Sequence, residues 1–152
     1  MNEQLEKIKK GQLGFSLIEM MIVLLIIGMI SAVAYPSYDR FRKNRETEYF
    51  IRTFQKDIVH MQQKAVNENR IYNLSIDNEK HKYEVRGNGS KEPVKKDFPK
   101  HIWFESYSML LSVQYNQNGN ISRAGTLYIH SATSSYKMVF QLGKGKFYVA
   151  KQ

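Results

Sequence analysis

Cysteine is absent from this chain of 152 residues. Without it the protein has no disulfide framework and no thiolate that acts as a nucleophile or a metal ligand. Its stability must therefore come from burying aromatic and aliphatic side chains, in which the second half of the sequence is rich. The length leaves room for one modest domain.

Catalytic and metal-binding patterns are also missing. The four histidines lie far apart, and no two have the spacing of a helical metal site; they are His60, His81, His101 and His130. The stretch Gly143–Lys146 lacks the spacing of a phosphate-binding loop, and no G-x-S-x-G motif occurs. We therefore expect no enzyme, no bound metal and no cofactor.

Acidic residues are scarce relative to basic ones. The chain has 23 lysines and arginines against 14 aspartates and glutamates, which gives a formal net charge of +9. A basic surface attracts anionic partners such as lipid headgroups, cell-wall polymers or nucleic acid. Scattered positive charges also keep a small domain soluble, so the charge alone does not choose between these interpretations.

One long apolar run stands out, from Phe15 to Ala34. Only Ser16, Glu19 and Ser31 interrupt it. A helix of about 20 residues rises about 30 Å, which is enough to cross the hydrocarbon core of a membrane. An ionised carboxylate inside such a segment costs roughly 2.5–3.5 kcal/mol, so Glu19 is expected to have a specific cationic partner.

A newly created amino terminus is the cation that the sequence offers to Glu19. A short leader that contains three lysines, Met1–Gly14, precedes the apolar run. Cleavage between Gly14 and Phe15 would create a positively charged amine four residues from Glu19, or about one helical turn away. Between two neighbouring helices shifted by about one turn, the amine of one can pair with the carboxylate of the next, and each charge offsets the other's desolvation.

This junction resembles the class III signal of type IV pilins and pseudopilins, in which a basic leader ends in glycine and glutamate is the fifth mature residue. Gly14, Phe15 and Glu19 match that pattern, and Pro36 matches the proline that often bends the long helix. The resemblance implies cleavage after Gly14 by a prepilin peptidase, N-methylation of Phe15 and assembly into a filament with other pilins. It also implies a single-pass membrane precursor with a cytoplasmic N-terminus, and a place at the cell surface or in the cell wall after assembly.

Two other interpretations of the N-terminus stay open. Ala32-Val33-Ala34 fits the small-residue cleavage site of a secretory signal, which would release a soluble protein beginning at Tyr35. A plain single-pass anchor, with Glu19 reaching to the membrane interface, is the other. Sequencing the mature N-terminus separates the three, because it would begin at Phe15, Tyr35 or Met1. Charge counting leaves the orientation ambiguous, since basic residues also follow the apolar run.

A single long helix is predicted from Phe15 to about Asn69, with a bend near Pro36, which lacks the N–H that a helix needs. Beyond the bend, apolar residues recur at spacings of three and four, which is typical of a helix face packed against the protein's own sheet. These residues are Ile51, Phe54, Ile58, Met61 and Ala65. Asn67-Glu68-Asn69 is expected to end the helix.

After the helix the period of apolar residues changes to two, which indicates strands. The predicted strands are Arg70–Ile76, Lys80–Arg86, Ile102–Glu105, Met109–Tyr115, Thr126–His130, Tyr136–Leu142 and Lys146–Ala150. Turns are expected at Asp77–Glu79, Asn118-Gly119 and Gly143–Gly145, and a polar loop at Gly87–Pro99. The fold class is α+β and pilin-like, with a helix that covers one face of an antiparallel sheet, either single or split into two.

These elements divide the chain into four expected segments. Residues 1–14 are the leader, 15–35 the transmembrane and assembly helix, 36–69 an extracytoplasmic helix, and 70–152 a β-rich globular region. Residues 36–152 are expected to form one domain.

The second half carries a narrower resemblance, to ComGD-type competence minor pseudopilins and the related H-type minor pseudopilins of type II secretion. The matching stretches are Asn118-Gly119, Gly125–Ile129 and Gly143–Val149. This resemblance implies a structural subunit of a competence pseudopilus needed for DNA binding and uptake in natural transformation. A subunit of a type II secretion system or type IV pilus, and a membrane-anchored DNA-binding module, are the alternatives.

Three lysines are the candidates for direct contact with DNA: Lys95, Lys96 and Lys100. Aromatic residues beside basic ones can also stack on single-stranded DNA, but the alternation within the predicted strands explains most of these rings as core.

Overall fold

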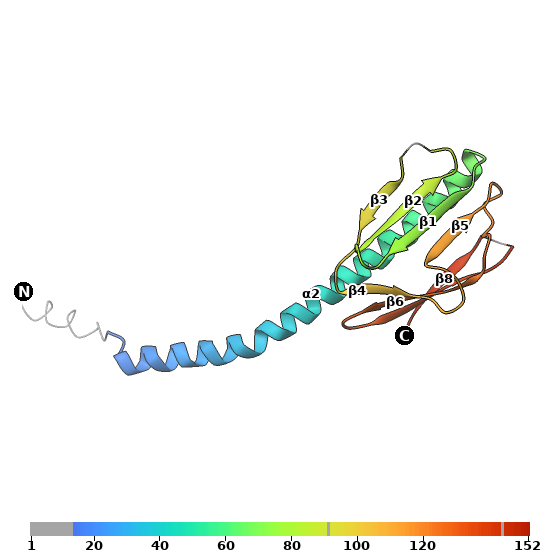
Figure 1. Ribbon diagram of the computed structural model, residues 1–152. Coiled ribbons are helices and arrows are strands. Elements are labelled where there is room, and N and C mark those ends of the chain that lie inside the picture. The colour runs from blue at the N-terminus through green and yellow to red at the C-terminus, as the bar shows by residue number, and fades with distance from the viewer. Residues whose placement is uncertain (1–13, 91, 144) are drawn as a thin grey trace, which may run out of the picture. The chain divides into compact units, whose positions relative to one another are not determined.

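The computed structural model describes residues 14–90, 92–143 and 145–152. The predicted leader lies outside these residues except for Gly14, and so does Lys144 of the predicted Gly143–Gly145 turn. The chain divides into two compact units, one that ends at Asp39 and one that runs from Arg40 to Gln152. In the described part, one helix is followed by two four-stranded antiparallel sheets (Figure 1).

Helix α2 extends from Leu17 to Asn67, which confirms the predicted long helix. Its backbone is helical through position 36, and the bend expected at Pro36 stays a prediction. The helix ends in a Schellman motif: Asn69 has a φ of 50°, and the Arg70 N–H donates to the Ala65 carbonyl at 3.0 Å. The predicted end of the helix near Asn69 is therefore confirmed.

The strands form two sheets. Sheet A has the order β3-β2-β1-β5, and sheet B the order β4-β6-β7-β8. The strands of sheet A are β1 (Tyr72–Asp77), β2 (Lys82–Gly87), β3 (Val94–Asp97) and β5 (Ser112–Tyr115). Those of sheet B are β4 (Ile102–Glu105), β6 (Gly125–Ser131), β7 (Ser135–Phe140) and β8 (Phe147–Lys151). The predicted α+β class is confirmed, and the sheet is split into two.

Strand β3 corrects the predicted polar loop at Gly87–Pro99. Val94 pairs with Val85 of β2, and the ladder continues to Asp97 opposite Lys82. β3 is an edge strand of sheet A, and all four of its side chains are exposed. Its sequence therefore lacks the apolar alternation that reveals half-buried strands, and its lysines protect the edge from pairing with another chain.

Helix α2 supplies the part of the core that both sheets share. The predicted apolar stripe is buried along its whole length, as is the neighbouring Phe50. The Phe54 ring centroid lies 5.1 Å from that of Tyr83 in sheet A and 5.3 Å from that of Phe104 in sheet B. A single helix side chain thus contacts both sheets.

The buried face of α2 continues from Phe50 toward the N-terminus as far as Thr47, which is completely buried. Its hydroxyl donates to the Lys43 carbonyl at 2.8 Å and lies 3.1 Å from Nε2 of His101. A buried hydroxyl needs such partners, because an unsatisfied one is costly.

The β5–β6 and β7–β8 loops pack against each other beside Gln62 of α2. Gln62 Nε2 donates to the Gly119 carbonyl at 2.8 Å, and Tyr115 Oη donates to the Gly145 carbonyl at 3.2 Å. Gly145 has a φ of 57°, and a Cβ on it would lie 2.1 Å from the Gly119 carbonyl oxygen. Only glycine fits this position, for both conformational and steric reasons.

Candidate functional site

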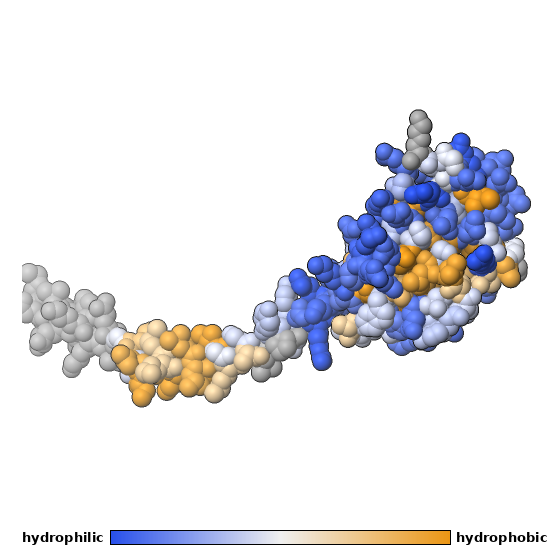
Figure 2. Space-filling view, in the orientation of Figure 1, coloured by the Kyte–Doolittle hydropathy of each residue, from blue (hydrophilic) through white to orange (hydrophobic). Residues whose placement is uncertain are grey.

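The apolar segment that begins at Phe15 presents its side chains to the surroundings. Phe15 is 79% exposed and Ile30 is 64% exposed, and the residues between them are exposed as well. Figure 2 shows this segment as a band of apolar residues. Its helix is long and apolar enough to cross a membrane. A surface of this size is unfavourable in water, so lipid or other apolar helices are expected to cover it.

Glu19 is the acidic residue of the first turn of α2. The Met20 N–H donates to the Ser16 carbonyl at 3.2 Å, so the helical hydrogen-bond pattern reaches back almost to Phe15. A helix N-terminus carries a partial positive charge, which stabilises a carboxylate and destabilises an amine. An amine created at Phe15 would therefore gain from a carboxylate at the depth of Glu19.

Polar groups within the apolar segment are few. Ser31 Oγ donates to the Ile27 carbonyl at 2.8 Å, so its hydroxyl can enter apolar surroundings without losing a hydrogen bond. Glu19 is the single charged side chain of the stretch from Phe15 to Ala34. Its pairing with a cation stays a prediction.

Gly14 is exposed and lies beside Phe15 at the start of the described residues. Among these residues, no atom lies within 4 Å of the position that a Gly14 Cβ would take. The described residues therefore leave room for a side chain at position 14. Cleavage after Gly14 and methylation of Phe15 stay predictions.

The three lysines proposed for DNA contact do not form one surface. Lys95 Nζ lies 3.5 Å from Oε1 of Glu84, and Lys96 Nζ lies 2.6 Å from Oδ1 of Asp57. Neighbouring residues of a strand point to opposite faces, which is why Lys95 meets the sheet and Lys96 meets the helix. Lys100 is exposed in the turn before β4.

Asp57 of α2 joins the helix to sheet A through two partners. Its carboxylate accepts a hydrogen bond from the Tyr83 hydroxyl on one oxygen and from Lys96 on the other. Burial raises the pKa of Tyr83 above its ordinary value, and the hydrogen bond to Asp57 raises it further. Lys96 therefore balances a carboxylate of the fold, which makes it a structural residue.

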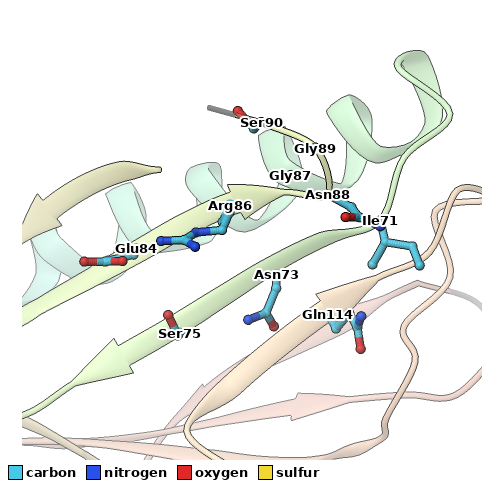
Figure 3. Close-up of a pocket in the computed structure, with 10 residues that line it drawn as sticks. All are labelled: Ile71, Asn73, Ser75, Glu84, Arg86, Gly87, Asn88, Gly89, Ser90 and Gln114. Carbon is cyan, nitrogen blue, oxygen red and sulfur yellow. The ribbon is translucent and has the colours of Figure 1, made fainter. Parts of the chain in front are cut away.

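A set of four polar side chains on the outer face of sheet A was not expected from the sequence. We call them the polar row: Arg86, Asn73, Gln114 and Arg123. The first three lie opposite one another on β2, β1 and β5 (Figure 3). They line an open depression of about 570 Å³. Exposed Asn73 alternates with buried Tyr72 and Leu74, so the sequence pattern can indicate that Asn73 points outward. The pattern does not indicate which strands lie side by side.

The N-terminal region matches a known family model. Residues 9–35 match the prokaryotic N-terminal methylation motif, which includes the junction at Gly14 and the position of Glu19. The match covers this segment alone. No curated protein is significantly similar in sequence to the chain.

The fold resembles that of a solved structure, the minor pseudopilin EpsH from the type 2 secretion system of Vibrio cholerae. The TM-score is 0.52 at 11% sequence identity, and the match covers 70% of this chain and 97% of that one. An identity this low shows a shared fold and does not by itself show a shared activity. The fold is pilin-like: a long N-terminal apolar helix followed by antiparallel sheets.

Proposed function

We propose that this chain, in which a prepilin-type N-terminal motif precedes a pilin-like fold, is a minor pseudopilin. It is a structural subunit of a filament and not an enzyme. More narrowly, we propose that the filament is the type IV pilin-like pseudopilus of a competence system, which is needed for DNA binding and uptake in natural transformation.

The observation that carries this proposal is an exposed apolar helix with one acid in its first turn. Apolar residues surround Glu19, and the methylation motif spans the same stretch. In the precursor the bilayer covers this helix. In the filament other pilin helices replace the lipid, and the amine of a neighbouring subunit replaces the water that a carboxylate needs.

The processing steps follow the motif. A prepilin peptidase cuts between Gly14 and Phe15 on the cytoplasmic side, and the new Phe15 amine is N-methylated. Methylation keeps the positive charge of the amine, so Glu19 retains its partner. The precursor is a single-pass protein of the cell membrane with its C-terminal domain outside, and the assembled subunit reaches the cell wall and surface.

The competence assignment is supported by the resemblance of the second half, in which the Gly143–Val149 stretch forms a glycine turn and then β8. A type II secretion or type IV pilus subunit is the second candidate, supported by the fold shared with EpsH. A membrane-anchored module that binds DNA without entering a filament is the third. In all three the protein is first inserted in the membrane, but they differ in partners and in the phenotype of a deletion.

Two measurements test the proposal. Sequencing the mature N-terminus should give N-methylated Phe15, and the protein should co-purify with other pilins. A retained Met1, or a start at Tyr35, would overturn the filament assignment. Deletion should abolish transformation while protein export continues. The reverse phenotype would assign the subunit to a secretion system instead.

A further inference from the structure

The polar row crosses sheet A at right angles to its strands. Arg86 pairs in register with Asn73, and Asn73 with Gln114. The Ser122 N–H donates to the Gln114 carbonyl at 2.9 Å, which holds Arg123 beside β5. Arg123 then lines a second depression, of about 280 Å³, together with Asn73 and Gln114. The row therefore has a guanidinium at each end and two amides between them.

The side chains of the polar row have no partners in the folded chain. Within the described residues, none of the four makes a hydrogen bond or an ion pair through its side chain, whereas the nearby Glu84 and Lys95 pair with each other. Guanidinium and amide groups are strong donors that normally find acceptors. Four of them aligned on one open face are thus available to an external ligand rich in acceptors.

We propose that the polar row binds the phosphate backbone of double-stranded DNA. The interstrand spacing of a sheet, about 4.8 Å, places Arg86 and Gln114 about 10 Å apart, with Arg123 beyond them. Arginine, asparagine and glutamine are among the residues that contact phosphate oxygens without reading sequence. This inference rests on the competence function proposed above, and it assigns the contact to residues other than the three lysines.

Two features favour duplex DNA over single strands and over acidic proteins. Single strands bind by stacking bases on aromatic rings, and the polar row contains no ring. Protein interfaces centre on buried aromatic or apolar anchors, and the row has none of these either. The neighbouring Glu84 does not repel phosphate strongly, because Lys95 lies 3.5 Å from its carboxylate.

Binding of the full-length chain, held in nanodiscs of neutral phosphatidylcholine, tests the proposal. The probes are a fluorescent 30-bp duplex and one of its single strands, each measured over a series of salt concentrations. The duplex should bind more tightly than the single strand. The variant with Arg86→Gln and Arg123→Gln should bind the duplex about tenfold more weakly, and the slope of log affinity against log salt should fall by about two.

A matched control removes the same charge elsewhere. Arg52 and Arg70 are exposed residues outside the polar row, and changing both to glutamine should weaken binding less than threefold. The Gln114→Arg variant should bind more tightly than the wild type, which tests the row even if the double variant folds poorly.

Three results would overturn the proposal: equal losses in the two double variants, preference for the single strand, or competition by polyglutamate as strong as that by duplex DNA. The last would indicate an acidic protein partner. None of these results bears on filament membership, which is measured by the mature N-terminus and by co-purification with pilins. The two proposals can therefore fail separately.

Discussion

Gly145 shows how much a single residue constrains the β7–β8 loop. Its positive φ and its contact with the Gly119 carbonyl leave no room for a side chain. Sequence reasoning predicted a tight turn here from the two glycines. It gave no reason why Gly145 lies against another loop, because that contact depends on residues 26 positions apart in sequence.

Gly145→Ala should destabilise the protein by at least about 2 kcal/mol, because strain and a backbone clash add. The matched control is Gly89→Ala. Gly89 also has a positive φ, of 79°, but among the described residues no atom lies within 4 Å of its Cβ position. This variant should lose only about 1 kcal/mol. Urea unfolding measures both changes, and equal losses would show that the Gly119 contact is unimportant.

The buried hydroxyl groups of Tyr83 and Tyr115 lead us to expect a loss of stability at alkaline pH. Burial and the hydrogen bond to Asp57 raise the pKa of Tyr83, and burial alone raises that of Tyr115. In the unfolded chain both phenols ionise near pH 10. The stabilisation is therefore fully present below about pH 10 and is lost as the pH rises above it. The urea concentration at the midpoint of unfolding should therefore be lower at pH 11 than at pH 9.

The Tyr83→Phe variant checks the cause of this alkaline loss. It removes a hydrogen bond to a carboxylate, so at pH 8 it should be less stable by about 1.5–3 kcal/mol. Above pH 10 its stability should fall less steeply than that of the wild type. Tyr148→Phe is the control, since Tyr148 is about half exposed. A decline of equal steepness in wild type and Tyr83→Phe would contradict the assignment.

At the scale of elements, the strongest prediction from sequence is helix α2. Apolar residues spaced three and four apart predicted each residue of its buried face. This works because a helix makes its backbone hydrogen bonds within itself, so its period does not depend on a neighbouring element. Strands are harder to predict when no side chain of the strand is buried, as in β3, because the apolar alternation is then missing. That is why β3 was missed and why Lys95 and Lys96 were grouped, although an ion pair holds each of them to a different element.

Phe54→Ala should be among the most destabilising core substitutions, at about 3–5 kcal/mol. Its ring contacts Tyr83 in one sheet and Phe104 in the other, so the cavity would weaken both. Val59→Ala, on the exposed side of the same helix, should change stability by less than about 0.5 kcal/mol. Thermal unfolding of the two variants compares them directly. A small effect of Phe54→Ala would show that the two sheets hold together without the helix.

For the whole molecule, the N-terminal segment was read correctly as a helix because long apolar runs leave few other structures possible. The pairing of Glu19 with an amine stays a prediction, which rests on one charge in apolar surroundings. The polar row was not predicted, because it requires knowing that β1 lies between β2 and β5. Long-range strand order is set by the joint packing of both sheets on α2, which no local pattern encodes.

Glu19→Ala should leave cleavage after Gly14 intact but reduce incorporation into filaments by at least about tenfold. An amine without its carboxylate partner costs several kcal/mol in apolar surroundings. A free-energy change of about 1.4 kcal/mol already alters an equilibrium constant tenfold. Glu46→Ala is the control, since Glu46 is an exposed acid outside the apolar segment. Immunoblots of sheared filament fractions measure incorporation. Normal incorporation of the Glu19→Ala subunit would refute the pairing.

The burial of Thr47 sets an upper limit on how many N-terminal residues can be removed from this protein without damage to its core. A shortened version that begins after residue 47 loses the hydroxyl that meets His101, and one that begins after residue 54 also loses two phenylalanines of the core. Water-soluble versions for crystallography or NMR should therefore start near Arg40. Removing the helix beyond residue 47 is expected to give aggregates and no folded domain.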